Sequence, residues 1–231
     1  MRLKQLRRGA DYLASLIRYL PLSFKYRKFT MIRHLRFIDN LALANSLAFR
    51  NPALAAGAVV ECGTWRGGMA AALVEVGGPN RTYCFLDSFQ GLPPAGDLDG
   101  DAAKTWQADT SAPGYYDNCA ATIEDFRSVI RMAGATSDTI RIVPGFFEDS
   151  FKTFAPPPIA VLRLDVDWYE STKQCLEHLW QHVLPGGLIV LDDYYAWSGC
   201  ALAVHEFLAA TKATERIRQS PVGRIAFLVK A

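Results

Sequence analysis

The chain has 231 residues, half of them hydrophobic, and its 25 Lys and Arg residues nearly balance its 23 Asp and Glu residues. This composition excludes an intrinsically disordered chain and leaves enough residues for one large domain with its own core. The charge is unevenly placed, because residues 1–39 hold ten Lys or Arg and two Asp or Glu, a net charge of +8. A short basic segment therefore precedes a mildly acidic globular domain.

The cysteines and the hydropathy pattern indicate the cellular setting. Five cysteines are scattered without a paired spacing, which favours neither a zinc site nor a disulfide framework. We therefore expect a reduced, cytoplasmic protein. The longest apolar runs are far shorter than a membrane span, and Asp11 and Arg18 interrupt the apolar part of the first twenty residues. We expect neither a membrane-spanning helix nor a signal peptide.

Residues 1–50 are predicted to form a basic helical extension ahead of a domain that spans residues 51–231. Apolar residues recur at helical spacing over residues 13–20, and Pro21 is expected to end that helix. A similar pattern predicts a second helix over residues 31–49.

From residue 58 onwards, short apolar runs alternate with longer amphipathic segments. The runs predict strands at residues 58–62, 82–86, 140–143, 159–164 and 188–191. The segments between them predict helices at residues 69–76, 118–132, 171–183 and 200–211. This alternation is typical of βαβ units, and so of a doubly wound α/β fold with a parallel sheet between two layers of helices.

Local signals refine these boundaries. Asp117 or Asn118 is expected to cap the helix at residues 118–132. Pro185, Gly186 and Gly187 are expected to stop the helix at residues 171–183. The polar segment at residues 88–117 is rich in Gly, Pro and Asp and predicts a long loop, either a functional lid or a variable surface insertion.

The C-terminal end departs from the βαβ pattern. Residues 214–220 and 224–229 flank a short Pro- and Gly-containing turn, which predicts an antiparallel hairpin at the edge of the sheet. A mostly parallel, seven-stranded sheet that ends in such a hairpin is the Rossmann-like variant of class I methyltransferases.

A glycine-containing turn follows the first buried strand and begins at Glu61. Gly63 allows the chain to turn tightly and brings its backbone close to a ligand, but the dinucleotide pattern G-x-G-x-x-G is absent. Asp87 ends the next strand, where an acidic residue can accept hydrogen bonds from both ribose hydroxyls. This combination suits a nucleoside without a pyrophosphate, such as S-adenosylmethionine. The alternative is an ordinary strand-to-helix turn beside a surface aspartate.

Four aspartates follow two later strands, Asp165 and Asp167 after one, and Asp192 and Asp193 after the other. The carboxyl ends of parallel strands line one crevice, so these side chains are expected to converge. Like charges at close range favour a bound cation, and the absence of accompanying Cys or His favours Mg²⁺ or Ca²⁺ over zinc. The alternative is that some of them cap helices, as Asp167 would at the helix that follows it.

Several motifs in order resemble the macrocin O-methyltransferase (TylF) family: V-E-C-G-T-W-R-G-G, D-S-F-Q-G-L-P, G-F-F-E-D, L-D-V-D-W-Y-E-S-T and D-D-Y. The resemblance covers residues 29–230. It implies an enzyme that uses S-adenosylmethionine and Mg²⁺ to methylate a sugar hydroxyl of a natural product or surface glycan. Phe146, Val166 and His205 replace the usual Trp, Gly and acidic residue of the family, and the identity of the acceptor does not follow from the resemblance.

The resemblance also implies roles for individual residues. The implied metal ligands are Asp165, Asp192 and Asp193, and the implied general base is Asp167. The implied cofactor contacts are Met31, Glu61, Cys62, Gly63, Thr64, Asp87, Ser88, Phe89, Phe147 and Glu148.

The expected partners are a small-molecule glycoside as acceptor and further copies of the chain in a homo-oligomer. The basic arm at residues 2–36 suits weak contact with an anionic membrane surface, packing against a partner subunit or solvation, and its short apolar face favours the last two. Nucleic acid is disfavoured, because the basic residues precede an acidic domain. Methylation of a catechol-like phenol and a non-catalytic cofactor-binding module stay open as alternatives, although the complete acidic set disfavours the second.

Overall fold

The computed structural model describes residues 2–134, 136 and 138–231, without the side chains of residues 2–11, 13 and 15. Four basic side chains of the predicted arm, at positions 2, 4, 7 and 8, therefore lie outside the described residues, as does the side chain at position 13 of the first predicted helix. Within the described part, no helix is both long enough and apolar enough to cross a membrane.

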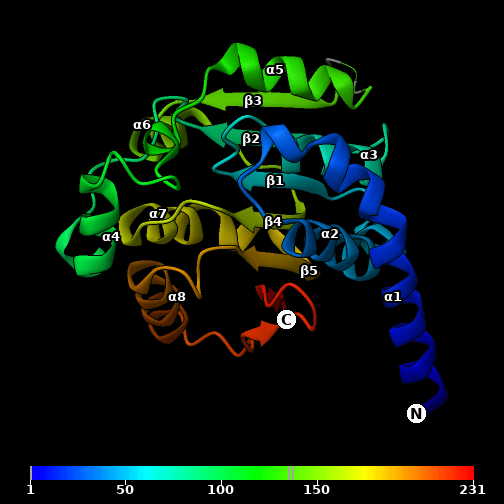
Figure 1. Ribbon diagram of the computed structural model, residues 1–231. Coiled ribbons are helices and arrows are strands. Elements are labelled where there is room, and N and C mark those ends of the chain that lie inside the picture. Colours follow the sequence, from blue (N-terminus) through cyan, green and yellow to red (C-terminus); the bar gives the residue numbers. More distant parts are fainter. Residues whose placement is uncertain (1, 135, 137) are drawn as a thin grey trace.

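A seven-stranded sheet runs through the centre of the molecule (Figure 1). Its strands are β1 (Ala58–Cys62), β2 (Tyr83–Asp87), β3 (Ile140–Pro144), β4 (Ile159–Leu164), β5 (Val183–Leu191), β6 (Arg218–Gln219) and β7 (Ala226–Val229). They lie in the order β3-β2-β1-β4-β5-β7-β6. The first five are parallel, while β7 pairs antiparallel with both β5 and β6. The predicted doubly wound sheet with a C-terminal antiparallel hairpin is confirmed.

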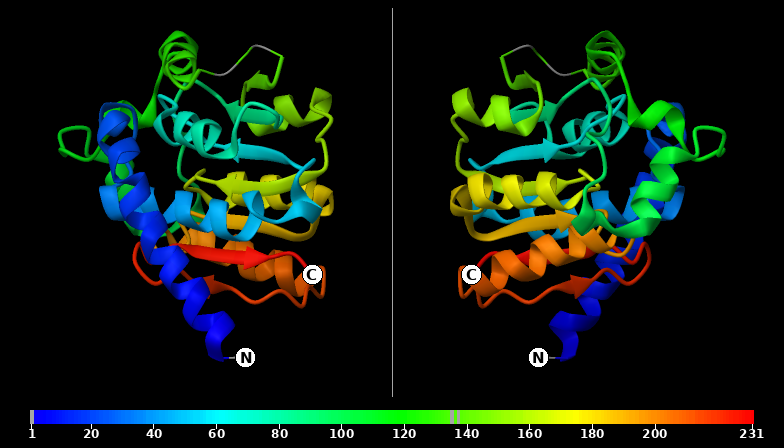
Figure 2. Two further views of the ribbon diagram at one scale, coloured as in Figure 1. Left: turned by 90° about the vertical axis from the view of Figure 1, so that its right-hand side faces the viewer. Right: turned by 90° about the vertical axis from the view of Figure 1, so that its left-hand side faces the viewer.

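Helices cover both faces of the sheet (Figure 2). They are α1 (Arg2–Lys25), α2 (His34–Leu43), α3 (Gly68–Gly77), α4 (Gly100–Ala108), α5 (Ile123–Met132), α6 (Phe147–Thr153), α7 (Tyr169–Leu179) and α8 (Ser198–Ala210). Side chains of successive strand residues point to opposite faces, so Val59 and Val60 of β1 enter different hydrophobic clusters. The Val59 cluster includes side chains of α1, α2, α3 and α5, and the Val60 cluster includes side chains of α7 and α8.

Pro21 does not end the first helix, and that prediction was wrong. Helix α1 continues through Pro21 to Lys25. A proline inside a helix costs about 3 kcal/mol, because one hydrogen bond is lost and the ring crowds the preceding turn. Tyr19 and Tyr26 are buried on either side of it, and burial of each such side chain contributes a similar amount. Tertiary packing therefore outweighs the local penalty.

Pro185, Gly186 and Gly187 do not stop a helix, which corrects a second prediction. Helix α7 ends at Leu179, and the Pro-Gly-Gly segment lies inside β5. Pro185 has no N–H to donate, so the pairing with β4 is interrupted between Val183 and Leu188. The Gly186 N–H donates instead to the Lys230 carbonyl at 2.8 Å, beyond the end of β7.

Helix α5 begins later than predicted. Its first residue is Ile123 and its N-cap is Thr122, whose hydroxyl accepts a hydrogen bond from the Asp125 N–H at 3.0 Å. The expected caps, Asp117 and Asn118, instead belong to a separate turn with left-handed backbone angles. The Asn118 side chain cannot cap a helix, since it is bound to the segment that contains Leu92.

We expect Thr122→Ala to destabilise the protein by about 1 kcal/mol, because an N–H at the start of α5 loses its acceptor. Chemical denaturation followed by circular dichroism measures this change. Ser128→Ala on the same helix is the matched control, and its effect should stay within about 0.5 kcal/mol because Ser128 is exposed. Equal effects of the two substitutions would contradict the role of Thr122 as the cap.

The segment at residues 88–117 is only partly the irregular loop that was predicted, since it contains α4 and a 3-10 turn at Asp97–Asp99. Asp99 is buried and accepts a hydrogen bond from the Tyr169 N–H at 2.6 Å, at the start of α7. The Trp168 indole N–H donates to the Pro93 carbonyl at 2.9 Å. These bonds hold the segment beside the carboxyl ends of the strands.

Candidate active site

The predicted site residues gather at the carboxyl ends of the parallel strands. The strand order reverses between β1 and β4, and ligands of doubly wound sheets bind in the crevice at such a point. Glu61 lies in β1, Asp165 follows β4 and Asp192 follows β5. Parallel strands that end at one edge of a sheet explain why residues far apart in the sequence meet here.

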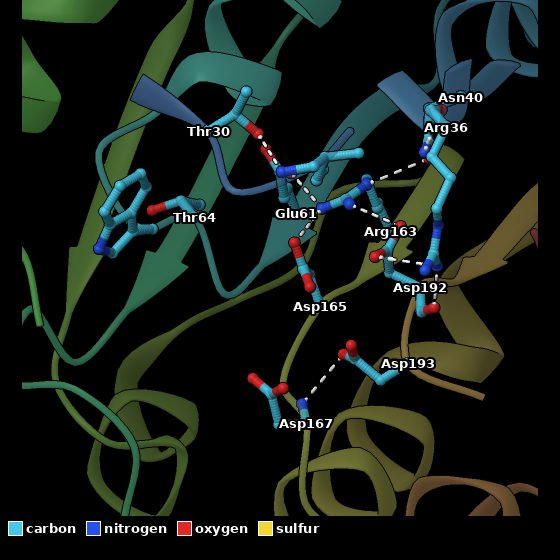
Figure 3. A network of polar contacts seen from close by, with 12 residues as sticks. Thr30, Arg36, Asn40, Glu61, Thr64, Arg163, Asp165, Asp167, Asp192 and Asp193 are labelled. Atoms are coloured by element: carbon cyan, nitrogen blue, oxygen red, sulfur yellow. Dashed lines mark hydrogen bonds and ion pairs between the residues drawn. The ribbon is translucent and has the colours of Figure 1, made fainter. Parts of the chain in front are cut away.

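Three of the four predicted aspartates form one compact cluster. Asp165, Asp192 and Asp193 each offer a carboxylate oxygen, and these oxygens all lie within 4.8 Å of one another. The backbone N–H of Asp167 donates to Asp193 Oδ2 at 3.0 Å (Figure 3). The structure therefore brings all four acids together. Three of them form a group that could hold a metal ion, and Asp167 lies beside that group.

Arg163 binds two acids of this cluster, and it was not singled out from the sequence. Its side chain is 1% exposed, and its Nη1 donates to Glu61 Oε1 at 2.7 Å and to Asp165 Oδ2 at 2.8 Å. Its Nη2 lies 2.9 Å from Asp192 Oδ1, as an ion pair without hydrogen-bond alignment. A lone arginine in an otherwise apolar strand was the available signal, because a buried cation requires acidic partners.

Helix α2 also reaches the cluster, which the sequence pattern did not reveal. Arg36 donates to both the carbonyl and Oδ2 of Asp192, the latter at 3.2 Å. Asn40, one turn further along α2, accepts a hydrogen bond from Arg163 Nε at 3.3 Å. Two residues near the N-terminus thus orient groups that lie more than 120 residues later in the chain.

Burial and mutual repulsion raise the pKa values of Asp165, Asp167 and Asp193. Burial, followed by the charges of Asp167 and Asp165, holds the pKa of Asp193 well above its usual range. Burial and then the Asp165 charge raise the pKa of Asp167 to about 7. Burial also raises the pKa of Glu61 to about 8, although Arg163 opposes that shift. A bound cation would relieve this repulsion and favour the ionised carboxylates.

The backbone at Asp167 is left-handed, with a φ of 58°. This conformation is uncommon for residues other than glycine, but Asp and Asn adopt it more readily than most. Asp167 Oδ1 accepts a hydrogen bond from the Trp197 indole N–H at 2.8 Å. This bond fixes the carboxylate of Asp167 beside the cluster.

The glycine turn after β1 approaches Asp165 closely. Gly63 has a φ of +76°, and a Cβ atom there would overlap the carbonyl of Asp165. Asp87, at the end of β2, accepts hydrogen bonds on Oδ2 from the N–H groups of Thr64 at 2.6 Å and Trp65 at 2.9 Å. The carboxylate of Asp87 thus fixes the turn on which the predicted cofactor contacts lie.

Two cavities meet at the acidic cluster. The lining of the first includes Gly63, Asp87, Ser88, Phe147 and Glu148. The lining of the second includes Glu61, Thr64, Asp192, Asp193 and the aromatic residues Trp65, Trp106, Tyr116 and Trp197. The residues that line both are Met31, Trp65, Cys119, Asp165 and Asp167.

The sequence matches the profile of the macrocin-O-methyltransferase (TylF) family over residues 24–225. The chain belongs to this family. The matched region encloses every predicted site residue and helix α2, which contributes Arg36 and Asn40 to the acidic site.

Curated relatives carry names of O-methyltransferases. The 8-demethyl-8-(2,3-dimethoxy-alpha-L-rhamnosyl)-tetracenomycin-C 4'-O-methyltransferase of Streptomyces olivaceus is 36% identical over 157 residues, 65% of this chain and 58% of that protein. The mycinamicin III 3''-O-methyltransferase of Micromonospora griseorubida is 34% identical over 157 residues, 65% of this chain and 60% of that protein. The chain thus matches less than two thirds of the length of these relatives.

Among solved structures, the O-methyltransferase NovP superposes with a TM-score of 0.72 at 26% identity and covers 84% of this chain and 80% of NovP. The calicheamicin methyltransferase CalS11 superposes with a TM-score of 0.59 at 23% identity, with 82% of this chain and 78% of CalS11 covered. Both likenesses concern the overall fold.

Two of the residues that the family resemblance assigned to the cofactor lie away from both cavities. Cys62 is fully buried in β1, and its side chain belongs to the hydrophobic cluster beneath α7. Phe89 packs against Phe126 of α5, with ring centroids 5.6 Å apart. Neither side chain is among the residues that line the cavities.

Proposed function

We propose that this protein transfers a methyl group from S-adenosylmethionine to a hydroxyl of a sugar on a natural product, with the help of a divalent cation such as Mg²⁺. The observation that carries the proposal is the acidic cluster, because Asp165 and Asp167 line both cavities where they meet. Membership of the TylF family and the names of the curated relatives support the reaction class.

The first cavity suits the methyl donor. When bound, S-adenosylmethionine supplies the methyl group as part of a sulfonium cation. Asp87 and Ser88 would hold the ribose end, and Phe147 would pack beside the adenine. Glu61 Oε2 is buried and has no hydrogen-bond partner within the described part of the chain. An ammonium group would satisfy that oxygen, so the methionine end of the donor is proposed to extend past Asp165 into the second cavity, which Glu61 and Thr64 line.

The cluster of Asp165, Asp192 and Asp193 suits a hard divalent cation. Its three donors are carboxylate oxygens within 4.8 Å of one another, and the acids outnumber the two arginines that contact them. Oxygen donors favour Mg²⁺ over softer metals. When bound, the cation supplies positive charge that lowers the pKa of an acceptor hydroxyl.

Asp167 is proposed as the general base. It would accept the hydroxyl proton as the acceptor oxygen forms its bond to the methyl carbon, while the bond from that carbon to sulfur breaks. Its position at the meeting point of the two cavities brings it near both substrates, and its hydrogen bond to Trp197 orients the carboxylate. Proton transfer to a positioned base typically contributes 10²–10⁴-fold to a rate.

The part of the second cavity that the aromatic residues line is proposed to take the acceptor. The ring centroids of Trp106 and Trp197 lie 6.0 Å apart in an edge-on arrangement, and both residues line this cavity together with the acids. Sugars place their apolar faces against such rings while their hydroxyls contact polar groups. A phenol also fits an aromatic wall, so the experiment below includes one.

The purified protein, S-adenosylmethionine and Mg²⁺ are expected to add 14 daltons to one or more members of a glycoside panel, measured by mass spectrometry. Catechol and caffeate serve as the phenol arm. Calorimetry with S-adenosylhomocysteine and NAD supplies the binding control, and only the first is expected to bind. Methylation of phenols alone would refute the sugar acceptor, and absence of S-adenosylhomocysteine binding would refute the reaction class.

A further inference from the structure

A turn of left-handed backbone lies beside the second cavity. Tyr116, Asp117, Asn118 and Cys119 have φ values of 49°, 54°, 52° and 60°, respectively. Residues other than glycine disfavour this region, and a run of four is rare because each residue adds its own conformational free-energy cost. Such a conformation persists only when surrounding contacts impose it.

The side chain of Asn118 supplies two of those contacts. Its Nδ2 donates to the Leu92 carbonyl at 2.8 Å, and its Oδ1 accepts from Gln107 Nε2 of α4 at 2.9 Å. The Asn118 carbonyl also accepts from the Leu92 N–H at 3.0 Å. Gly91 permits this close approach, because a Cβ atom there would lie 2.6 Å from the Asn118 carbonyl oxygen.

The turn places two of its own side chains at the site. Tyr116 lines the second cavity, and Cys119 lies where the two cavities meet. The Tyr116 ring packs edge-on against Trp65 at 6.0 Å between centroids, and the Trp65 indole N–H donates to the Ala120 carbonyl at 3.1 Å. The shape of the cavity wall thus depends on the backbone of the turn.

We propose that Asn118 is a positioning residue, which locks the left-handed turn at residues 116–119 and thereby fixes the wall of the cavity against which the acceptor binds. The inference rests on the proposed function, in which the second cavity takes the acceptor. Without the side-chain bonds of Asn118, the turn relaxes toward the right-handed or extended backbone that its residues prefer. Tyr116 and Cys119 then move relative to the acids, while the donor contacts at Asp87 and Ser88 stay in place.

Alkylation of Cys119 tests whether Asn118 holds the turn at residues 116–119 in place, and it requires no methyl-acceptor substrate. Cys119 is partly exposed, whereas the other four cysteines are buried. We expect Asn118→Ala to raise the rate of N-ethylmaleimide labelling at Cys119 about tenfold, as followed by peptide mass spectrometry, since two hydrogen bonds that hold the turn are lost. Asp117→Gly is the matched control in the same turn, and it should label no faster than the parent because glycine favours positive φ.

Activity measurements then separate positioning from general stability. For the glycoside that the parent methylates best, Asn118→Ala should raise the acceptor KM about tenfold, with unchanged affinity for S-adenosylhomocysteine in calorimetry. If the Ala variant is unstable, Asn118→Asp replaces it in the test. Aspartate keeps the oxygen to which Gln107 donates and tolerates the left-handed backbone, so it should raise the KM in the same direction but by less. Labelling at the parent rate, or faster labelling with an unchanged KM, would overturn the proposal. A parent that fails to bind S-adenosylhomocysteine refutes the proposed function instead, and the labelling rates still decide whether Asn118 locks the turn.

Discussion

Asp193→Asn is expected to lower methyl transfer by at least about a thousandfold. The loss of one anionic ligand removes several kcal/mol of charge stabilisation, and each 1.36 kcal/mol corresponds to a factor of ten in rate. The substitution preserves shape, and its amide oxygen can still accept the hydrogen bond that Asp193 Oδ2 accepts from the Asp167 N–H. Single-turnover assays, together with calorimetric titration of Mg²⁺, measure both effects.

The matched control is Asp101→Asn, which removes one carboxylate from an exposed position on α4. It should leave turnover and Mg²⁺ affinity unchanged. Excess EDTA should abolish methyl transfer by the unsubstituted protein, and added Mg²⁺ should restore that activity. If Asp193→Asn retains turnover, or if the parent works fully in EDTA, the carboxylate cluster does not serve a cation in the reaction.

Asp167→Asn is expected to lower the rate of the methyl-transfer step by about 10²–10⁴-fold, the usual contribution of a positioned base. Asparagine is the informative replacement for two reasons. It tolerates the left-handed backbone at this position, where φ is 58°, and its amide oxygen can still accept the Trp197 N–H. The substitution therefore removes the basic oxygen while leaving the surrounding geometry intact.

Calorimetry with S-adenosylhomocysteine distinguishes the base from a cofactor ligand. Donor affinity should change by less than about twofold in Asp167→Asn, because Asp167 is proposed to contact the acceptor proton rather than the donor. A variant that binds the donor weakly yet retains the single-turnover rate of the parent would show that Asp167 holds the cofactor and that another group takes the proton.

The mostly parallel sheet and the meeting of the acids were predictable from the sequence. Apolar runs at residues 58–62 and 159–164 can be buried on both faces only in a parallel sheet, and such strands present their carboxyl ends at one edge. Asp165 directly follows the run at residues 159–164, and Asp192 directly follows the run at residues 188–191, so their convergence needed no knowledge of the loops. The division of the chain into helices and strands could also be predicted, because hydrophobic periodicity is a local property of the sequence.

Helix ends were less predictable where tertiary contacts opposed a local signal. Pro21 lies within a helix because tyrosines on either side of it are buried, and Pro185 lies in an interrupted strand because Gly186 finds a partner near the C-terminus. Asn118 resembles a helix cap in the sequence, but its amide is bound to Leu92 and Gln107. For Pro185 and Asn118 the deciding partner is distant in the sequence.

By itself, then, the amino-acid sequence determined the doubly wound sheet, the acidic set at its carboxyl edge and the TylF family. Only the tertiary structure decided how those acids are held. Arg36 and Asn40 come from a helix whose apolar periodicity carries no information about its polar partners. Arg163 contacts α2, β1 and the segments that follow β4 and β5 at once. Hydrogen bonds and ion pairs are short-ranged and directional, so they are set by the positions of backbones in space and not by the spacing of residues along the chain.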